Sequence, residues 1–398
     1  MRNPVPRYGH TLRDQWQFEP GITYLNHGAF GAPSIPVEEA ARRWRDRTAA
    51  NPTAFFERQL PSALRDNAQE LASHLGGTGD DLVFVNNVTA GINAVLRSLV
   101  LMPGDEVVVT NHLYISARRT LDFVCERAGA RLIFADVPFP VRNENDIVSA
   151  IVGAMSPRTR LVMLDHVTHE TALVLPIERI AARCAERGVA VLIDGTHGPG
   201  NIPIALDRLG NQGVGWYAGS CHNWLGAPQG CGFLWVHPDR QGLIRPTAIS
   251  NRFGDGFTEA FDWPGTSDFS AWLAVTEALR HRGTLGGDRV PTYTHDLAQR
   301  AAGLLRDRWN TLTGAPLEMF SGMATVALPV DGPATPSAAA DLRHTLRGDY
   351  RIEVHIMPFN GRLWVRLSAY LYNEISDYER LAEAVLEITG GNPVAANG

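Results

Sequence analysis

The chain has 398 residues, 44% of them hydrophobic and 20% charged, which is ordinary for a soluble globular enzyme. A formal net charge of −6 and a sequence pI of about 6.1 give no basic footprint for nucleic acid or for an anionic membrane surface. The polar N-terminal segment lacks the apolar core of a signal peptide, and no apolar run is long enough to span a bilayer, so a cytoplasmic location is expected.

The basic and sulfur-containing residues are also informative. All 36 basic residues are arginines, and the chain contains no lysine. The cysteines form no CxxC pair, and reduced thiols in a cytosol are the simplest account of them. They are Cys125, Cys184, Cys221 and Cys231.

Short apolar strands alternate with amphipathic helices from about residue 81 to residue 236. The expected strands occupy residues 82–85, 106–109, 131–134, 161–164 and 189–193. The first four are followed by expected helices at 92–99, at 117–128, from about 145, and at 177–187. Continuous β-branched runs of this kind predict a parallel sheet with helices on both faces.

The alternation is lost after about residue 269. Long helices over residues 271–282 and 293–311 lead to strands at 352–355 and 363–366, which predicts a smaller α+β domain. A chain of this length suits two domains. We expect an N-terminal arm (1–20), a large domain (21–270) and a small domain (271–398) that N-terminal residues help to complete.

A helix that begins directly after the first expected strand is a candidate phosphate site. The backbone N–H groups of Val88, Thr89 and Ala90, with the threonine hydroxyl, would point at an anion there. Threonine is equally a common helix cap, so this segment by itself decides nothing.

Asp194 ends an entirely apolar strand. A buried carboxylate needs a cationic partner, because a lone buried charge is costly. A protonated pyridine nitrogen would be such a partner, and it would make the ring an electron sink. The alternative is a helix cap in a glycine-rich turn.

Histidines gather at the predicted strand ends and adjacent turns. Any one of them is more often structural than catalytic, but five near one crevice favour acid–base chemistry. Their separate strands argue against a compact metal motif, so no metal is expected. The five are His112, His166, His169, His197 and His222.

Arg366 lies in an expected strand of the small domain and is followed by Leu367 and Ser368. A guanidinium fork in this place could bind a substrate carboxylate through two hydrogen bonds. A surface role is the default for an arginine considered alone.

Together the motifs resemble class V aminotransferases of pyridoxal 5'-phosphate (PLP) fold type I, and most closely the isopenicillin N epimerase-like branch. The resemblance runs from about residue 24 to residue 386, and it implies a large domain with a mainly parallel seven-stranded sheet and a smaller C-terminal domain. The segments that carry it are 24–31, 51–58, 88–95, Asp194-Gly195-Thr196-His197, 220–232, Gly265-Thr266 and Arg366-Leu367-Ser368.

The resemblance also implies roles for single residues. The phosphate-binding positions of the family match Val88, Thr89, Ala90, Ser220 and His222. The ring that stacks on the pyridine matches His112 or Tyr114, the partner of the ring nitrogen matches Asp194, and the contact to the ring hydroxyl matches His197. A stretch lent by the neighbouring subunit matches Thr266, and the substrate-binding segments match Asn26 and Arg366. A homodimer and a small-molecule substrate with a carboxylate follow from these matches.

The chain departs from the family pattern at its centre. Asn223 stands where the family has the lysine that binds PLP as a Schiff base, and an amide nitrogen is not basic. His169 stands where relatives often have Asn or Ser, Ala172 where they often have Gly, and Ser267 where a basic residue is common. Relatives that remove sulfur use a late cysteine, and this chain has none after Cys231, so desulfurase activity is not expected.

Four readings remain open. The favoured one is a lysine-free enzyme for an amino acid or amino-acid-derived intermediate, in secondary metabolism such as antibiotic biosynthesis, with PLP or pyridoxamine phosphate (PMP) held noncovalently. In it His197, His222 or His169 moves a proton, and Asn223 only forms hydrogen bonds. The others are a cofactor-free epimerase, lyase, cyclase or condensing enzyme, a non-catalytic subunit, and an engineered variant that lost its one lysine.

Overall fold

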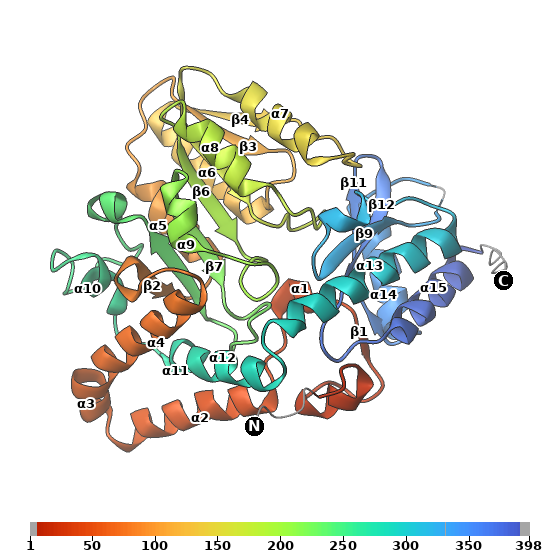
Figure 1. The fold of residues 1–398 in the computed structure, drawn as a ribbon, viewed down its shortest axis with the longest axis horizontal. Coiled ribbons are helices and arrows are strands. Elements are labelled where there is room, and N and C mark those ends of the chain that lie inside the picture. The colour runs from red at the N-terminus through yellow and green to blue at the C-terminus, as the bar shows by residue number, and fades with distance from the viewer. Residues whose placement is uncertain (1–5, 331, 391–398) are drawn as a thin grey trace.

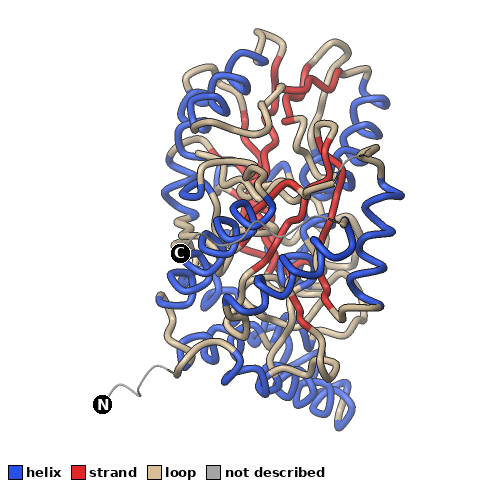
Figure 2. Tube along the Cα trace, turned by 90° about the vertical axis from the view of Figure 1, so that its right-hand side faces the viewer, coloured by secondary structure: helices blue, strands red, loops and turns tan. Residues whose placement is uncertain are grey.

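The computed structural model describes residues 6–330 and 332–390 (Figures 1 and 2). Its larger part is built around a seven-stranded sheet with the order β2-β8-β7-β6-β5-β3-β4. The strands are β2 (Leu82–Val85), β3 (Glu106–Thr110), β4 (Arg131–Ala135), β5 (Thr159–Asp165), β6 (Ala190–Gly195), β7 (Val214–Ser220) and β8 (Gly232–Val236). Strand β8 is antiparallel to both of its neighbours, and the other pairings are parallel. The expected fold class is confirmed.

Helices cover both faces of this sheet, as Figure 2 shows. Those inserted between its strands are α5 (Val88–Ser98), α6 (Ile115–Ala128), α7 (Glu144–Ala154), α8 (Ile177–Ala185) and α9 (Leu206–Asn211). Along β3, Val107 and Val109 pack into one buried apolar cluster and Val108 into the other. Because both faces are buried, the strands are apolar without alternation, which is the pattern that predicted a parallel sheet.

Further helices precede the sheet and follow it. Before it come a 3-10 helix (His10–Gln15), α1 (His27–Phe30), α2 (Ile35–Ala50), α3 (Pro52–Ala54), a π-helical turn (Phe55–Gln59), α4 (Leu60–His74) and a 3-10 turn (Gly79–Asp81). After it come a 3-10 helix (Pro238–Leu243), α10 (Phe257–Asp262), α11 (Ser270–Leu273) and α12 (Val275–Thr284). Helix α2 packs along α11 and α12, so this helix lies against the segment that leaves the large sheet.

The smaller part, on the right in Figure 1, has its own sheet with the order β11-β12-β9, all antiparallel. Its elements are α13 (Arg289–Trp309), a 3-10 turn (Leu317–Met319), β9 (Met323–Ala327), α14 (Pro336–Gly348), β11 (His355–Phe359), β12 (Arg362–Ser368) and α15 (Ile375–Thr389). Strand β1 (Thr23–Tyr24) pairs in parallel with β10 (Ile352–Glu353) beside this sheet. N-terminal residues therefore do contact the small α+β unit.

The structure refines several expected elements. The strand expected at 352–355 is divided, since β10 pairs with β1 while His355 begins β11. The helix expected at 271–282 is interrupted at Ala274, between α11 and α12. The division into 1–20, 21–270 and 271–398 stays a prediction, and its residues 1–5, 331 and 391–398 lie outside the described chain. Within the described chain, no helix is long and apolar enough to cross a membrane.

Candidate active site

Asp194 lies at the carboxyl end of β6 and is buried, as predicted for the end of an apolar strand. Its Oδ1 accepts hydrogen bonds from the backbone N–H (2.9 Å) and the hydroxyl (2.6 Å) of Thr196. No cationic side chain of residues 6–330 or 332–390 forms an ion pair with it, and burial raises the pKa of the Asp194 carboxyl. Its neighbour in the β5–β6 register is Asp165, also buried, whose Oδ2 has no hydrogen-bond partner.

His197 and His169 meet in the loops that follow β6 and β5. His197 Nε2 lies 3.1 Å from His169 Nδ1, and the Trp224 indole N–H lies 3.4 Å from His197 Nδ1. An indole can only donate, so Nδ1 of His197 accepts, its Nε2 donates to His169, and His169 carries its proton on Nε2. Burial, reinforced by the charge of Arg366, holds the pKa of both imidazoles well below the ordinary range. The pair is therefore neutral, with the His169 Nε2–H as its free donor.

Asn223 is buried in the β7–β8 connection, with both ends of its amide engaged. Its Nδ2 donates to the Gly28 carbonyl (2.7 Å), and its Oδ1 accepts the Ser220 hydroxyl (2.6 Å). The amide thus ties the N-terminal segment to the end of β7. Ser220, predicted to bind phosphate, has its hydroxyl proton directed at Asn223.

His222 is half-buried next to Asn223. Its Nδ1 lies 3.0 Å from the Cys231 carbonyl oxygen, so Nδ1 carries the proton and Nε2 has the lone pair. Burial lowers the pKa of this imidazole. In the neutral form His222 therefore presents a base, and it could donate to a phosphate only after taking up a second proton.

Helix α5 begins at the predicted phosphate segment. The Asn87 side chain caps it by accepting from the Ala90 N–H (2.9 Å), and Thr89, exposed, shares a hydrogen bond with Ser116 (3.2 Å). Val88 is buried. The cap of this eleven-residue helix is thus supplied by Asn87 rather than Thr89, and the phosphate role of its first turn stays a prediction.

Arg366 is completely buried on β12. Its Nη1 donates to the carbonyl of His169, its Nη2 lies 3.4 Å from Asn26 Oδ1, and its Nε has no hydrogen-bond partner. No carboxylate of the described residues forms an ion pair with it, and burial lowers its pKa to about 10. The charge of Glu170 acts on this guanidinium from beyond ion-pair distance. A buried guanidinium without a carboxylate in contact is a costly arrangement that a ligand carboxylate would relieve.

Two predicted cofactor residues lie apart from this cluster. His112 has both ring nitrogens engaged, by the Thr171 hydroxyl (2.7 Å) and the Val137 carbonyl (3.2 Å), and it packs on Phe139 and Phe359. Burial lowers its pKa to about 4. Thr266 is exposed and borders a surface pocket of about 400 Å³.

Other residues of the predicted set also find clear places. Tyr114, the alternative to His112, lies with its ring 4.5 Å from that of His169. His166 is buried, with Nδ1 3.0 Å from the Tyr217 hydroxyl. Ala172 is buried with a φ of 60°, in the left-handed region that favours glycine. Hydrogen bonds thus connect four residues of the predicted set, which are His169, His197, Asn26 and Arg366.

Sequence reasoning missed three residues near this cluster. Asp165 ends β5 just as Asp194 ends β6, so the rule that selected one could have selected both. Glu170 directly follows His169, and its carboxylate lies 2.8 Å from His355 Nε2. No local signal marks His355, because it lies 185 residues away on the small sheet.

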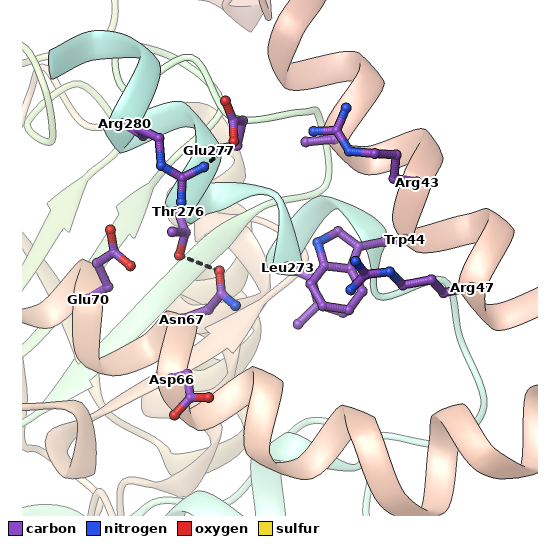
Figure 3. A pocket seen from close by; sticks show the side chains of 11 residues that line it. Arg43, Trp44, Arg47, Asp66, Asn67, Glu70, Leu273, Thr276, Glu277 and Arg280 are labelled. Carbon is purple, nitrogen blue, oxygen red and sulfur yellow. Dashed lines mark hydrogen bonds and ion pairs between the residues drawn. The ribbon is translucent and has the colours of Figure 1, made fainter. Parts of the chain in front are cut away.

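A separate cavity of about 360 Å³ lies between α2, α4 and the α11–α12 segment (Figure 3). Figure 3 shows Arg43 and Arg47 on one wall, with Glu277 and Arg280 paired on another. It shares no residue with the cluster at Arg366. Within residues 6–330 and 332–390, no group of three or more His, Cys, Asp or Glu side chains is placed to hold a metal ion.

Comparisons with known proteins show the family of the chain. The sequence pattern of the family described as aminotransferase class-V matches residues 48–381. Isopenicillin N epimerase of Amycolatopsis lactamdurans is 33% identical over 95% of this chain and 98% of its own, and that of Streptomyces clavuligerus is 32% identical with the same coverage. A probable chloroplastic L-cysteine desulfhydrase of Arabidopsis thaliana is 28% identical over 92% of this chain and 83% of its own.

Solved structures show the same fold. A C-DES mutant with glycine covalently linked to the PLP cofactor aligns with a TM-score of 0.80 at 24% identity, over 94% of this chain and 98% of that one. The apo cysteine desulfurase of Thermococcus onnurineus aligns with a TM-score of 0.80 at 18% identity, over 97% and 99%. The chain therefore belongs to the class V aminotransferase family.

Proposed function

We propose that the chain is an enzyme that acts on an amino acid or amino-acid-derived intermediate and uses PLP or PMP without a covalent bond to the protein. One observation carries this proposal. Asp194 and Arg366, two buried groups of opposite charge, each lack an ion-pair partner among the described residues. Arg366 donates a hydrogen bond to the backbone carbonyl of His169, and the imidazole of His169 is hydrogen-bonded to that of His197. A cationic ring nitrogen suits the first, and a substrate carboxylate suits the second.

The residues present fit a PLP or PMP ligand. Asp194 would accept the protonated ring nitrogen, which would reverse the effect of burial on its pKa. The first turn of α5 and His222 would hold the phosphate, and Tyr114 is a better placed stacking ring than His112, because it is half-exposed beside His169. When bound, the ring supplies an electron sink for bonds at the substrate carbon.

Proton transfer would fall to the imidazoles. The His169 Nε2–H is the free donor of the His169–His197 pair. His222 Nε2 would act as a base only where it does not donate to the phosphate. Asn223 cannot move a proton, and with its amide fixed between Gly28 and Ser220 it acts by positioning the β7–β8 loop. This assignment specifies the prediction that a histidine, in place of the lysine, is the base.

The amine of the substrate could hold the cofactor instead of a lysine. In the solved C-DES mutant, glycine is covalently linked to the PLP cofactor. In this chain Arg366 would hold the carboxylate of such an amino acid, and Asp194 would hold the ring nitrogen of the cofactor. The epimerase and desulfhydrase names of relatives favour an isomerase or lyase reaction.

One observation favours the cofactor-free alternative. The Ser220 hydroxyl, expected on a phosphate, donates to Asn223, and both nitrogens of His112 are engaged within the protein. A substrate held by Arg366 alone, with acid–base chemistry by His169, would use the same cluster without PLP.

Calorimetric titration with PLP and with PMP separates the cofactor-dependent proposal from the cofactor-free alternative. We expect both to bind the wild type, with PLP keeping the absorption spectrum of the free aldehyde. Asp194→Asn should weaken binding roughly tenfold to a hundredfold, because a charge-assisted hydrogen bond is lost, whereas Asp207→Asn, on the surface of α9, should not.

A gain-of-function variant completes the test. Asn223→Lys should form a covalent bond to PLP, detected by mass spectrometry after borohydride reduction, whereas the wild type should not. Failure of PLP and PMP to bind the wild type at about millimolar concentration, well above typical affinities, would mean that the cofactor-free alternative is right.

A further inference from the structure

Glu170 and His355 form a carboxylate–imidazole pair that the proposed function does not use. Glu170 lies in the loop between β5 and α8, His355 begins β11, and Glu170 Oε2 is 2.8 Å from His355 Nε2. A carboxylate can only accept, so the His355 proton lies on Nε2 and its lone pair on Nδ1. This is the arrangement in which a carboxylate orients a histidine base.

The pair is fixed beside Arg366 from two sides. His355 is the register partner of Arg366 across β11 and β12, so both side chains lie on the same face of the small sheet. The Arg366 guanidinium donates to the carbonyl of His169, the residue before Glu170. Both members of the pair are thus held next to the group proposed to bind the substrate carboxylate.

The charge state suits a base. Burial alone would raise the pKa of Glu170, but the hydrogen bond from His355 and the positive charge of Arg366 hold it below its ordinary value. Burial lowers the pKa of His355, against the opposing effect of Glu170. At neutral pH the pair is therefore an ionised carboxylate and a neutral imidazole.

The pair is also reachable from solvent. The side chains of His355 and Glu170 are 23% and 34% exposed, whereas His197 is completely buried. The His355 ring lies 6.3 Å from that of His169, so the two acid–base groups are close but distinct. A pair that only bridged the two sheets would need neither this access nor the place beside Arg366.

We propose that Glu170 and His355 are a second acid–base unit, which acts on the atom next to the carboxylate that Arg366 binds. A proton leaving that atom moves to His355 Nδ1, its electron pair stays on the substrate, and the imidazolium is stabilised by the Glu170 carboxylate; the reverse step returns the proton. The inference rests on the proposed role of Arg366, and it adds His355 to the imidazoles that the proposed function assigns to proton transfer.

Affinity labelling tests this without any cofactor. Iodoacetate carries a carboxylate beside an alkylating carbon, from which a neutral imidazole nitrogen displaces iodide to form an N–C bond. Mass spectrometry of the full-length protein would follow carboxymethylation of His355 and of His344, an exposed histidine on α14. We expect His355 to react at least roughly tenfold faster than His344, because the bound carboxylate places the reacting carbon.

Three controls sharpen the result. Neutral iodoacetamide should lose the preference for His355, and excess acetate should protect His355 in the wild type. Arg366→Gln should abolish the iodoacetate preference, whereas Arg362→Gln, exposed on the same strand, should keep it. Glu170→Gln should slow the labelling of His355.

Equal rates at His355 and His344, equal rates with the two reagents, or no protection by acetate would overturn the inference. The wild-type measurements decide this even if Arg366→Gln does not fold. Since labelling needs neither PLP nor PMP, His355 can be labelled selectively although both fail to bind, and the two proposals can therefore fail separately.

Discussion

At the scale of single residues, burial controls the ionisation of two neighbouring carboxyl groups in this protein. Asp165 and Asp194 are register neighbours at the ends of adjacent parallel strands, both buried and both without an ion-pair partner among residues 6–330 and 332–390. Burial and the neighbouring Asp194 raise the pKa of Asp165 well above its usual range. Burial and the proximity of the two carboxyls therefore favour the protonated form of one of them unless a cation binds.

This predicts an unusual pH dependence of stability. A carboxyl with a raised folded pKa contributes stability that is complete below its unfolded pKa and is lost as pH rises through the folded value. Asp165→Asn, which cannot ionise and can donate to Asp194, should gain stability relative to the wild type between about pH 5 and pH 8, by about 1–3 kcal/mol at the upper end.

Urea unfolding at several pH values measures this, with the exposed Asp207→Asn as the matched control. A constant difference between Asp165→Asn and wild type across the range would show that Asp165 is already ionised in the folded protein. Binding of PLP to the wild type should reduce the pH effect, because a ring cation would neutralise Asp194.

Among the elements, the short helix α1 (His27–Phe30) matters most for the centre of the site. Its Gly28 carbonyl accepts the Asn223 amide, and Gly31, which ends it with a φ of 67°, lies so close that a Cβ there would be 1.8 Å from the His222 carbonyl oxygen. The position of Asn223 is thus set by an N-terminal segment almost two hundred residues before it.

Gly31→Ala should therefore destabilise the protein by at least about 2 kcal/mol, because it adds a steric clash to the backbone strain. Gly104→Ala is the matched control, since Gly104 also has a positive φ (87°) but nothing within 4 Å of its would-be Cβ. Equal losses in urea unfolding for the two variants would mean that α1 does not pack on the β7–β8 loop in solution.

At the scale of the whole molecule, a second copy of the chain is expected. Thr266, predicted to serve a neighbouring subunit, lies in a surface pocket with Phe56 and Trp263, and the loop beside it exposes Ile249 (60%) and Phe253 (45%). Apolar side chains so exposed around a pocket favour burial in an interface.

Sedimentation should therefore give twice the chain mass of 43.5 kDa. Replacing both Ile249 and Phe253 by glutamate should shift the protein toward monomer, because two buried charges would be unpaired in the interface. The same double replacement at Val100 and Met102, which are at least as exposed (87% and 60%) and lie elsewhere, should leave the dimer intact. A wild-type monomer at about micromolar concentration, where obligate dimers are assembled, would contradict the prediction.

The sequence by itself determined the fold class and the places where site residues lie along the chain. Apolar runs such as 106–109 and 189–193 are local patterns that predict a parallel sheet. Ligands bind at the carboxyl ends of the strands in such a sheet, so Asp194, His197 and His169 could be selected without coordinates. The absence of lysine is likewise a fact of the sequence alone.

Only the tertiary structure decided which of these side chains meet. His112 was selected by the same rule as His197, yet it is engaged by Thr171 and Val137, whereas His169 meets both His197 and, through its backbone, Arg366. The Glu170–His355 pair joins residues 185 positions apart on two different sheets. Periodicity records the burial of a residue within its own element, but hydrogen-bond partners depend on how separate elements pack, and no local pattern encodes that.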